Sequence, residues 1–209
     1  IQPRLPPRRP GRVVTSTVRP NSHLPEFTGV IETDTVLRVR RHVELAATER
    51  RIVSICGPSG TGKTTLASLV SSATGRRFVE LSAVTAGVKD VREVIDRAKD
   101  ALGMYGEGTV LFVDEVHRFS KTQQDALLPA VENGWVTLIA ATTENPAFSV
   151  ISPLLSRSLV LTLESLSNAD IEGLLRRAVE DPRGLASSVR LSDDACAQIL
   201  RVAGGDARR

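Results

Sequence analysis

One segment, Gly57–Thr65, constrains what this chain can fold into more than any other. It follows the pattern G-x-x-x-x-G-K-[ST], in which glycines let several backbone N–H groups converge on one phosphate group. A helix that begins near Lys63 directs the positive end of its dipole at the same point. The segments Ile52–Cys56 before it and Leu66–Val70 after it supply the strand and the helix that such a loop needs. We therefore predict a phosphate-binding loop rather than a chance match in a glycine-containing turn. Its residues are, in order, Gly57, Pro58, Ser59, Gly60, Thr61, Gly62, Lys63, Thr64 and Thr65.

The residue types in and after this loop predict a chemistry. Lys63 is expected to reach the β- and γ-phosphates of a bound nucleotide, and the Thr64 hydroxyl is expected to ligate Mg²⁺. The apolar run Thr109–Val113 leads directly into two acids, and the carboxyl end of a strand is where open α/β sheets bind ligands. We expect Asp114 to hold Mg²⁺, directly or through water, and Glu115 to polarise the attacking water as a general base. The alternative is a pair of solvated loop acids, which the preceding loop disfavours.

From Arg51 onward, short apolar runs alternate with amphipathic stretches. Between Val88 and Leu102, spacings of three and four place apolar side chains on one helix face. Strands alternating with helices indicate parallel βαβ units, with helices on both faces of one sheet. Two helices, about 168–180 and 193–203, follow the last strand and suggest a small lid, with Ser167 and Asp170 as a capping pair. The five expected strands are Ile52–Cys56, Phe78–Leu81, Val110–Val113, Val136–Ala141 and Leu159–Leu163.

Several single residues favour structural roles. His117 has no second metal ligand nearby, so packing or a switch is expected of it rather than metal binding. Pro129 is expected to kink or end the helix after Gln123, because proline lacks the backbone donor. Cys56 and Cys196 are too few and too far apart for a disulfide framework or a cysteine-ligated zinc site. We therefore expect a reducing, cytosolic compartment.

The composition excludes some classes of protein. No stretch approaches 18 consecutive apolar residues, so we predict no membrane span, and the lack of a basic and apolar leader argues against secretion. With 41% apolar residues, 209 residues suffice for a core that needs no disulfides, in one domain or slightly more. A net charge of +3 does not by itself indicate nucleic-acid binding, and 3% aromatic residues argue against a base-stacking surface.

Residues 1–28 are predicted to form a flexible arm rich in Pro and Arg. Residues 1–25 hold six of the eleven prolines and five arginines, and proline both fixes φ and lacks a donor. A solvated linker and a tail that contacts phosphates are the two interpretations of this arm. The chain begins at Ile1 without Met and ends at Arg209, so we also expect it to be a fragment.

Further segments complete an ordered set of motifs. They read VDEVHRF at Val113–Phe119, QQDALLP at Gln123–Pro129, ATTENPAF at Ala141–Phe148 and LSR at Leu155–Arg157. With the phosphate-binding loop, this set resembles AAA+ ATPases of the clamp-loader clade. The stretch SAVTAGVK at Ser82–Lys89 is similar, within that clade, to the replication-associated recombination protein A group, relatives of the Werner-helicase-interacting ATPase. The resemblance is dense from Arg51 to Arg209 and poor over the first fifty residues.

The resemblance implies a fold. It is the α/β P-loop NTPase fold of AAA+ proteins, with three αβα layers and a five-stranded parallel sheet of order 5-1-4-3-2. Residues 29–163 would form the nucleotide-binding domain, and residues 164–209 would form a truncated helical lid.

The resemblance also implies roles for residues beyond the loop and the acidic pair. Thr142 or Thr143 looks like the polar sensor that orients the attacking water, with Thr142 preferred and Asn145 less favoured. Arg157 looks like an arginine finger that acts on the ATP of the neighbouring subunit. Arg208 resembles a second sensor residue that this family carries in its helical lid, which would place Arg208 against the γ-phosphate bound to its own subunit.

The function that the resemblance implies is Mg²⁺-dependent ATP hydrolysis, stimulated by DNA, at stalled replication forks, gaps or single-strand/double-strand junctions. Replication proteins such as single-strand-binding protein would be partners. The full-length protein would be a homo-oligomer and the present chain a weak monomer, in the cytoplasm and, in a bacterium, associated with the nucleoid. A clamp-loader subunit or a branch-migration motor is the alternative within enzymes. A nucleotide-gated scaffold without turnover is the alternative from another class.

Overall fold

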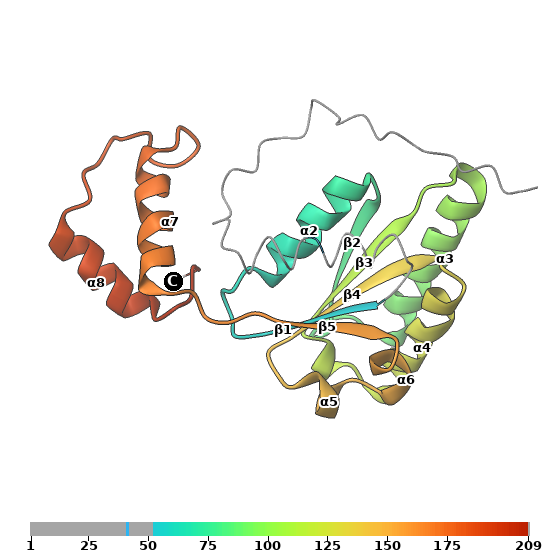
Figure 1. Cartoon of the computed structure of the whole chain (residues 1–209). Helices are drawn as coiled ribbons and strands as arrows, with labels where there is room; N and C mark the ends of the chain where they lie inside the picture. Colours follow the sequence, from blue (N-terminus) through green and yellow to red (C-terminus); the bar gives the residue numbers. More distant parts are fainter. Residues whose placement is uncertain (1–40, 42–51, 209) are drawn as a thin grey trace, which may run out of the picture.

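A five-stranded parallel sheet forms the centre of the protein (Figure 1). The computed structural model describes Arg41 and residues 52–208, so the arm expected over residues 1–28 lies outside the described part. The strand order is β2-β3-β4-β1-β5, which confirms the predicted order read from the opposite edge. Each strand lies within one residue of its expected bounds: β1 (Ile52–Cys56), β2 (Arg77–Ser82), β3 (Thr109–Asp114), β4 (Val136–Thr142) and β5 (Ser158–Thr162).

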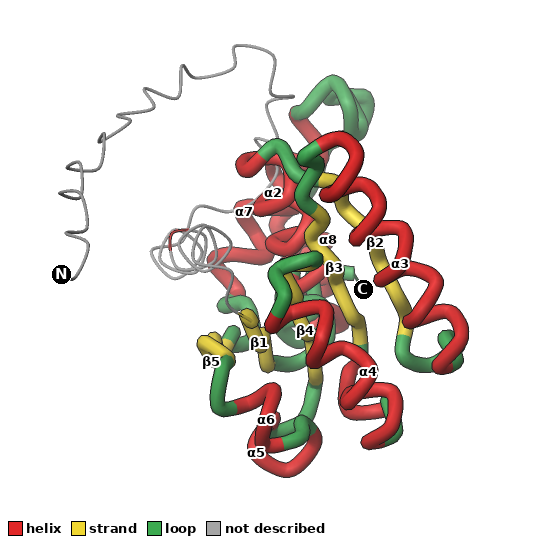
Figure 2. The backbone as a smooth tube through the Cα atoms, turned by 90° about the vertical axis from the view of Figure 1, so that its right-hand side faces the viewer, coloured by secondary structure: helices red, strands yellow, loops and turns green. Residues whose placement is uncertain are grey.

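Alternate residues of the central strands face two separate cores. In β3, Leu111 and Val113 pack with α3 (Val88–Tyr105) and α4 (Lys121–Glu132), whereas Val110 and Phe112 pack with α2 (Lys63–Thr74). Side chains in a strand point to opposite faces in turn, so a strand covered by helices on both faces is apolar throughout. Figure 2 shows the sheet between these helices. The predicted three-layer αβα arrangement is therefore confirmed.

Local capping sets where several helices begin and end. Ser120 and Gln123 form a capping box at the start of α4, and Ser167 with Asp170 form the predicted one at the start of α7 (Asn168–Glu180). Of the two outcomes expected at Pro129, a kink or a helix end, the helix end is wrong, because α4 continues through Pro129 to Glu132. The missing N–H of Pro129 removes only the bond to the carbonyl four residues earlier, and the residues after Pro129 keep their own N–H donors, so the last turn still forms.

The C-terminal helices lie apart from the sheet. α7 and α8 (Asp193–Ala203) pack against each other and occupy the ranges predicted for the two C-terminal helices (Figure 1). Short helical turns, the 3₁₀ turn Val116–Arg118, α5 (Pro146–Ser149) and α6 (Ser152–Leu155), connect the strands elsewhere. Among the helices of the described residues, none combines the length and the apolar character that crossing a bilayer requires.

The substitution Phe112→Ala tests the packing of the core between the sheet and α2. It is fully buried and its ring stacks on Phe78 with centroids 6.1 Å apart, whereas Phe148 is 91% exposed. We expect Phe112→Ala to lower the free energy of unfolding by about 3–5 kcal/mol, because it leaves a cavity. The matched variant Phe148→Ala should stay within about 0.5 kcal/mol of the parent. Urea unfolding followed by circular dichroism measures both, and equal losses would contradict the packing described above.

Candidate active site

The phosphate-binding loop follows β1 and turns sharply because its glycines adopt backbone angles that other residues avoid. Gly57, Gly60 and Gly62 have φ values of 153°, 74° and 88°. A Cβ at Gly57 would collide with the carbonyl oxygen of Leu163, so this position also needs the space that glycine leaves. The Gly57 N–H donates to the Thr142 carbonyl at 3.2 Å, which ties the start of the loop to the end of β4.

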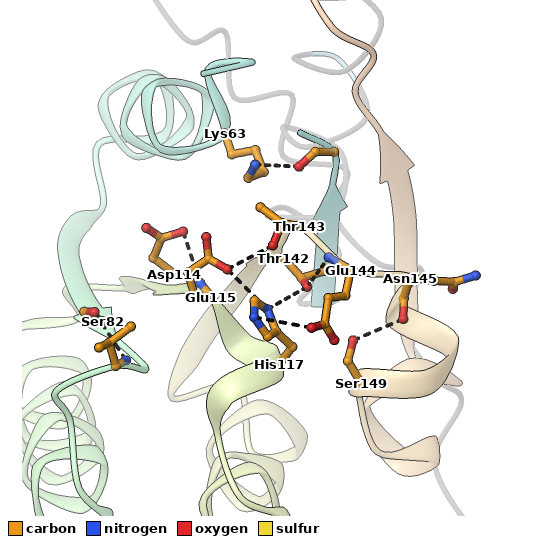
Figure 3. Close-up of polar contacts among 12 residues, drawn as sticks. Lys63, Ser82, Asp114, Glu115, His117, Thr142, Thr143, Glu144, Asn145 and Ser149 are labelled. Atoms are coloured by element: carbon orange, nitrogen blue, oxygen red, sulfur yellow. Dashed lines mark hydrogen bonds and ion pairs between the residues drawn. The ribbon is translucent and has the colours of Figure 1, made fainter. Parts of the chain in front are cut away.

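Lys63 begins α2 and its side chain folds back over the loop. Its ammonium donates to the carbonyl oxygens of Gly57 and Pro58, each at 2.7 Å, and the residue is only 6% exposed. Burial lowers the pKa of Lys63, and the nearby carboxylates of Glu115 and Asp114 oppose that shift. A cation therefore lies between the loop and the acidic pair (Figure 3), where an anionic ligand would be attracted.

The acidic pair stands at the carboxyl end of β3. An oxygen of the Asp114 carboxylate accepts the Glu115 N–H at 3.1 Å. Glu115 has φ 54° and ψ 44°, the left-handed conformation, which for a residue with a side chain costs on the order of 1–3 kcal/mol. Strained residues of this kind cluster at functional sites. Here the left-handed conformation turns the chain directly after β3. Nothing in the sequence indicates this backbone conformation.

Glu115 is held by side chains from two other segments. The Thr143 hydroxyl donates to its Oε2 at 3.3 Å, and His117 Nδ1 lies 3.2 Å from the same oxygen. His117 Nδ1 also lies 3.0 Å from the Thr142 hydroxyl, which accepts the Glu144 N–H at 3.0 Å. Figure 3 shows these side chains pointing toward one another. Of the two candidate sensors, Thr143 thus contacts Glu115 directly, and Thr142 contacts His117, the partner of Glu115.

Two residues have roles that the sequence analysis did not assign to them. Asn145 accepts the Ala147 N–H at 2.9 Å and caps α5, so its side chain is engaged in local structure rather than with the acidic pair. His117 is largely buried, in agreement with the expected packing role, and in addition it bridges Glu115 and Thr142. Its position two residues after Glu115 is the only signal in the sequence, and it does not reveal a contact with Thr142.

The donor set fits Mg²⁺ held together with phosphate oxygens. Within the described residues, no group of three His, Cys, Asp or Glu side chains could hold a metal ion by itself. Mg²⁺ is commonly bound by one or two protein oxygens plus substrate phosphates. The Asp114 carboxylate ends β3 beside the loop, and Thr64 lies in the first turn of α2, directly after Lys63. These two oxygen ligands match that mode of binding.

The C-terminal segment contacts the phosphate-binding loop. The Arg208 guanidinium donates to the Ser59 hydroxyl at 3.3 Å, and the Ala207 N–H donates to the Gly60 carbonyl at 3.4 Å. The Arg208 N–H in turn donates to the Asp206 carboxylate at 2.8 Å. The structure therefore brings Arg208 to the loop of its own chain, 149 residues away in sequence from Ser59.

Arg157 lies at the opposite edge of the sheet. Its neighbour Ser158 pairs with Ile52, the first residue of β1, whereas the loop follows the last residue of β1. The Arg157 guanidinium is 3.1 Å from Glu132 and donates to the Pro153 carbonyl at 2.8 Å. The structure does not bring Arg157 to the phosphate-binding loop of the same chain.

Comparisons with known proteins agree with this geometry. The family model described as "ATPase family associated with various cellular activities (AAA)" matches residues 53–163. An uncharacterized AAA domain-containing protein of Mycobacterium tuberculosis is 59% identical over 75% of this chain and 34% of its own length. Replication-associated recombination protein A of Escherichia coli is 50% identical over 73% of this chain and 34% of its own length. ATPase WRNIP1 of Dictyostelium discoideum is 46% identical over 73% of this chain and 17% of its own length.

The chain spans about a third of the length of the first two of these relatives. Among solved structures, the Thermotoga maritima RuvB Holliday junction branch migration motor superposes with a TM-score of 0.67 at 25% sequence identity. This similarity covers 86% of the present chain and 59% of that protein.

Alanine substitutions at two glycines of the loop test whether residues 206–208 dock on it. Gly60 and Gly62 both have positive φ, so an alanine at either incurs strain of about 1–2 kcal/mol. Only a Cβ at Gly60 would meet Asp206, whose Cα would lie 2.9 Å away, while described residues leave open space at Gly62. We expect Gly60→Ala to speed amide hydrogen exchange at Ala207, and Gly62→Ala to leave it near the parent rate. Equal rates in both variants would contradict the docking.

Proposed function

Because this chain belongs to the ATPase family associated with various cellular activities, we propose that it binds ATP with Mg²⁺ at the phosphate-binding loop and hydrolyses it. The observation that carries the proposal is the position of Glu115. Its carboxylate lies near the Lys63 cation, and Thr143 and His117 hold only one of its two oxygens. A carboxylate in that position suits the activation of water next to a γ-phosphate.

Each residue of the site has a proposed part in the reaction. The N–H groups of the loop bind phosphate oxygens, and Lys63 exchanges its bonds to Gly57 and Pro58 for bonds to the β- and γ-phosphates. Asp114 and Thr64 hold Mg²⁺, which supplies neutralising charge when bound. Glu115 accepts the proton of the attacking water.

Two further residues complete the site from the same chain. Thr142 or Thr143 orients the water, since both hydroxyls lie beside the Glu115 carboxylate or its partner His117. Arg208 places a second cation against the phosphates from the segment that follows α8. These assignments are supported by the contacts of the side chains, and the chemistry is that of phosphoryl transfer to water.

We further propose that Arg157 acts on the ATP of a neighbouring copy. It lies at the amino-terminal edge of the sheet, so it is out of reach of the loop in its own chain. An arginine supplied by a neighbour stabilises charge that develops on the γ-phosphate. The guanidinium is half-exposed at this edge, where it pairs with Glu132, so a neighbouring copy could reach it. The longer protein would then be a homo-oligomer, and the present chain a weak monomer at low concentration.

We propose DNA as the substrate on which this ATPase acts, in recombination associated with replication. The support is the 50% identity to replication-associated recombination protein A. Forks, gaps and single-strand/double-strand junctions are the structures that we propose, with single-strand-binding protein among the partners and the cytoplasm as the location.

A branch-migration motor is the second candidate, supported by the structural similarity to RuvB at a lower identity of 25%. A scaffold without turnover is disfavoured because Lys63, Asp114, Glu115 and Arg157 are all present.

Glu115→Gln tests the proposed hydrolysis. It keeps the size of the side chain but removes the base, so we expect turnover to fall by about 10²–10⁴-fold while the Kd for ATP is unchanged. Turnover of the parent, measured with Mg²⁺ over a protein concentration series, should rise when forked DNA is added. The matched control is Glu107→Gln, an exposed loop acid, which should keep full turnover. Full turnover in Glu115→Gln would refute the assignment of the base.

Mixing two inactive variants tests whether Arg157 acts between copies. We expect Arg157→Ala to lower turnover by about 10³-fold or more, and an equimolar mixture with Glu115→Gln to regain part of it. In the mixture, one chain supplies an intact Glu115 and its neighbour supplies an intact Arg157. The control variant Arg92→Ala, at an exposed site on α3, should keep full turnover. A mixture as inactive as its components would show that Arg157 does not act in this way.

A further inference from the structure

Among the residues that the structure describes, His117 is the side chain that contacts both Glu115, the proposed base, and Thr142, a proposed sensor. It lies on the 3₁₀ turn Val116–Arg118 directly after Glu115, and its side chain is 10% exposed. A single ring nitrogen, Nδ1, lies 3.2 Å from Glu115 Oε2 and 3.0 Å from the Thr142 hydroxyl (Figure 3). The chemistry of these two oxygens decides the form of the ring.

The Glu115 carboxylate fixes the position of the proton. An ionised carboxylate only accepts hydrogen bonds, and a neutral imidazole carries a hydrogen on one nitrogen and a lone pair on the other. A lone pair on Nδ1 would face the negative oxygen at 3.2 Å, which is repulsive. A hydrogen on Nδ1 makes the same contact attractive, so the geometry selects the Nδ1–H form.

The other ring nitrogen agrees with this form. His117 Nε2 lies 3.8 Å from the Glu144 carboxylate, which is beyond hydrogen-bond distance. No hydrogen on Nε2 is therefore needed to satisfy Glu144, whose side chain is 60% exposed to water. The hydrogen that this arrangement requires is therefore the one on Nδ1, the nitrogen that faces Glu115 and Thr142.

The Nδ1–H form has a consequence for Thr142. Its hydroxyl oxygen accepts the Glu144 N–H at 3.0 Å, and the contact with Nδ1 at 3.0 Å is then a second accepted bond. A hydroxyl accepts through two lone pairs and donates one hydrogen. With both lone pairs engaged, the hydroxyl hydrogen of Thr142 is left to donate to a third group, such as an attacking water or a phosphate oxygen.

We propose that His117 is a positioning residue which, with a hydrogen on Nδ1, holds the Glu115 carboxylate and the Thr142 hydroxyl with one N–H group. Glu115 keeps its second oxygen for the proton of water, and Thr142 keeps its hydrogen for donation. Without the ring, the bond from Thr143 at 3.3 Å is the one that described residues still provide to Glu115 Oε2. The inference deepens the proposed function and rests on it for the reaction, but the form of the ring can be measured without turnover.

Three substitutions distinguish this role from simple packing. The side-chain amide of Asn lies where His places Nδ1, whereas the longer Gln places its amide near the position of Nε2. We expect His117→Ala and His117→Gln to lower kcat by about 10–100-fold, the usual effect of losing a group that orients a reactive one. The Kd for ATP should not change, and His117→Asn should recover most of the kcat. Equal losses in Asn, Gln and Ala would overturn the proposal, since only packing would then matter.

Nitrogen-15 NMR of the histidine rings gives an independent reading. The His117 signals are assigned by their disappearance in His117→Asn, and the protonated nitrogen should be Nδ1 in the nucleotide-free chain. A hydrogen on Nε2 alone would overturn the proposal, whatever the activity. If the ring is protonated at Nδ1 but the parent chain shows no turnover under any condition, the proposed hydrolysis fails and the bridge between Glu115 and Thr142 stands.

Discussion

The pairing of β1 with β4 on one side and β5 on the other sets the position of nearly every residue in the site. The last residue of β1, Cys56, pairs with Thr142 of β4 and with Thr162 of β5. The loop that follows β1 therefore lies between the end of β4 and the end of β5, the strand that leads to the C-terminal helices. β3 lies on the other side of β4 and runs parallel to it, so Asp114, the last residue of β3, lies at the same edge of the sheet. Parallel strands deliver their carboxyl ends together, so a short register of backbone hydrogen bonds aligns segments that are distant in sequence.

Charge is concentrated at this edge and is only partly balanced. The cation of Lys63 is buried and satisfied by two carbonyl oxygens, while the carboxylates of Asp114 and Glu115 are half-buried nearby. Removing a cation from water is unfavourable unless other groups replace the water, and here the loop itself does so. Arg208 adds a second positive charge from the C-terminal segment and disfavours the protonated form of Lys63. An anion with several negative oxygens would relieve the repulsion between these two cations.

Local patterns in the sequence were sufficient to predict the strands, the phosphate-binding loop and both C-terminal helices. Buried strands read as apolar runs, and the glycines of the loop cannot be replaced without strain or collision. The order of the strands came from the family resemblance, because periodicity does not say which strand lies beside which. The left-handed conformation of Glu115 and the contact of His117 with Thr142 were not predictable. Both depend on tertiary contacts that the sequence pattern does not encode. The helix end expected at Pro129 was wrong for a related reason. The low helix propensity of proline does not say how near the end of a helix a proline is tolerated.

The segment that carries α7 and α8 is attached to the loop region at both of its ends. Leu163 donates to the Cys56 carbonyl at 2.8 Å where the segment leaves the sheet, and Ala207 donates to the Gly60 carbonyl at 3.4 Å where it returns. The loop residues 57 to 60 lie between these two attachments. A change in their backbone therefore alters the positions of both ends of the segment, and the helical pair, which lies apart from the sheet, shifts with them.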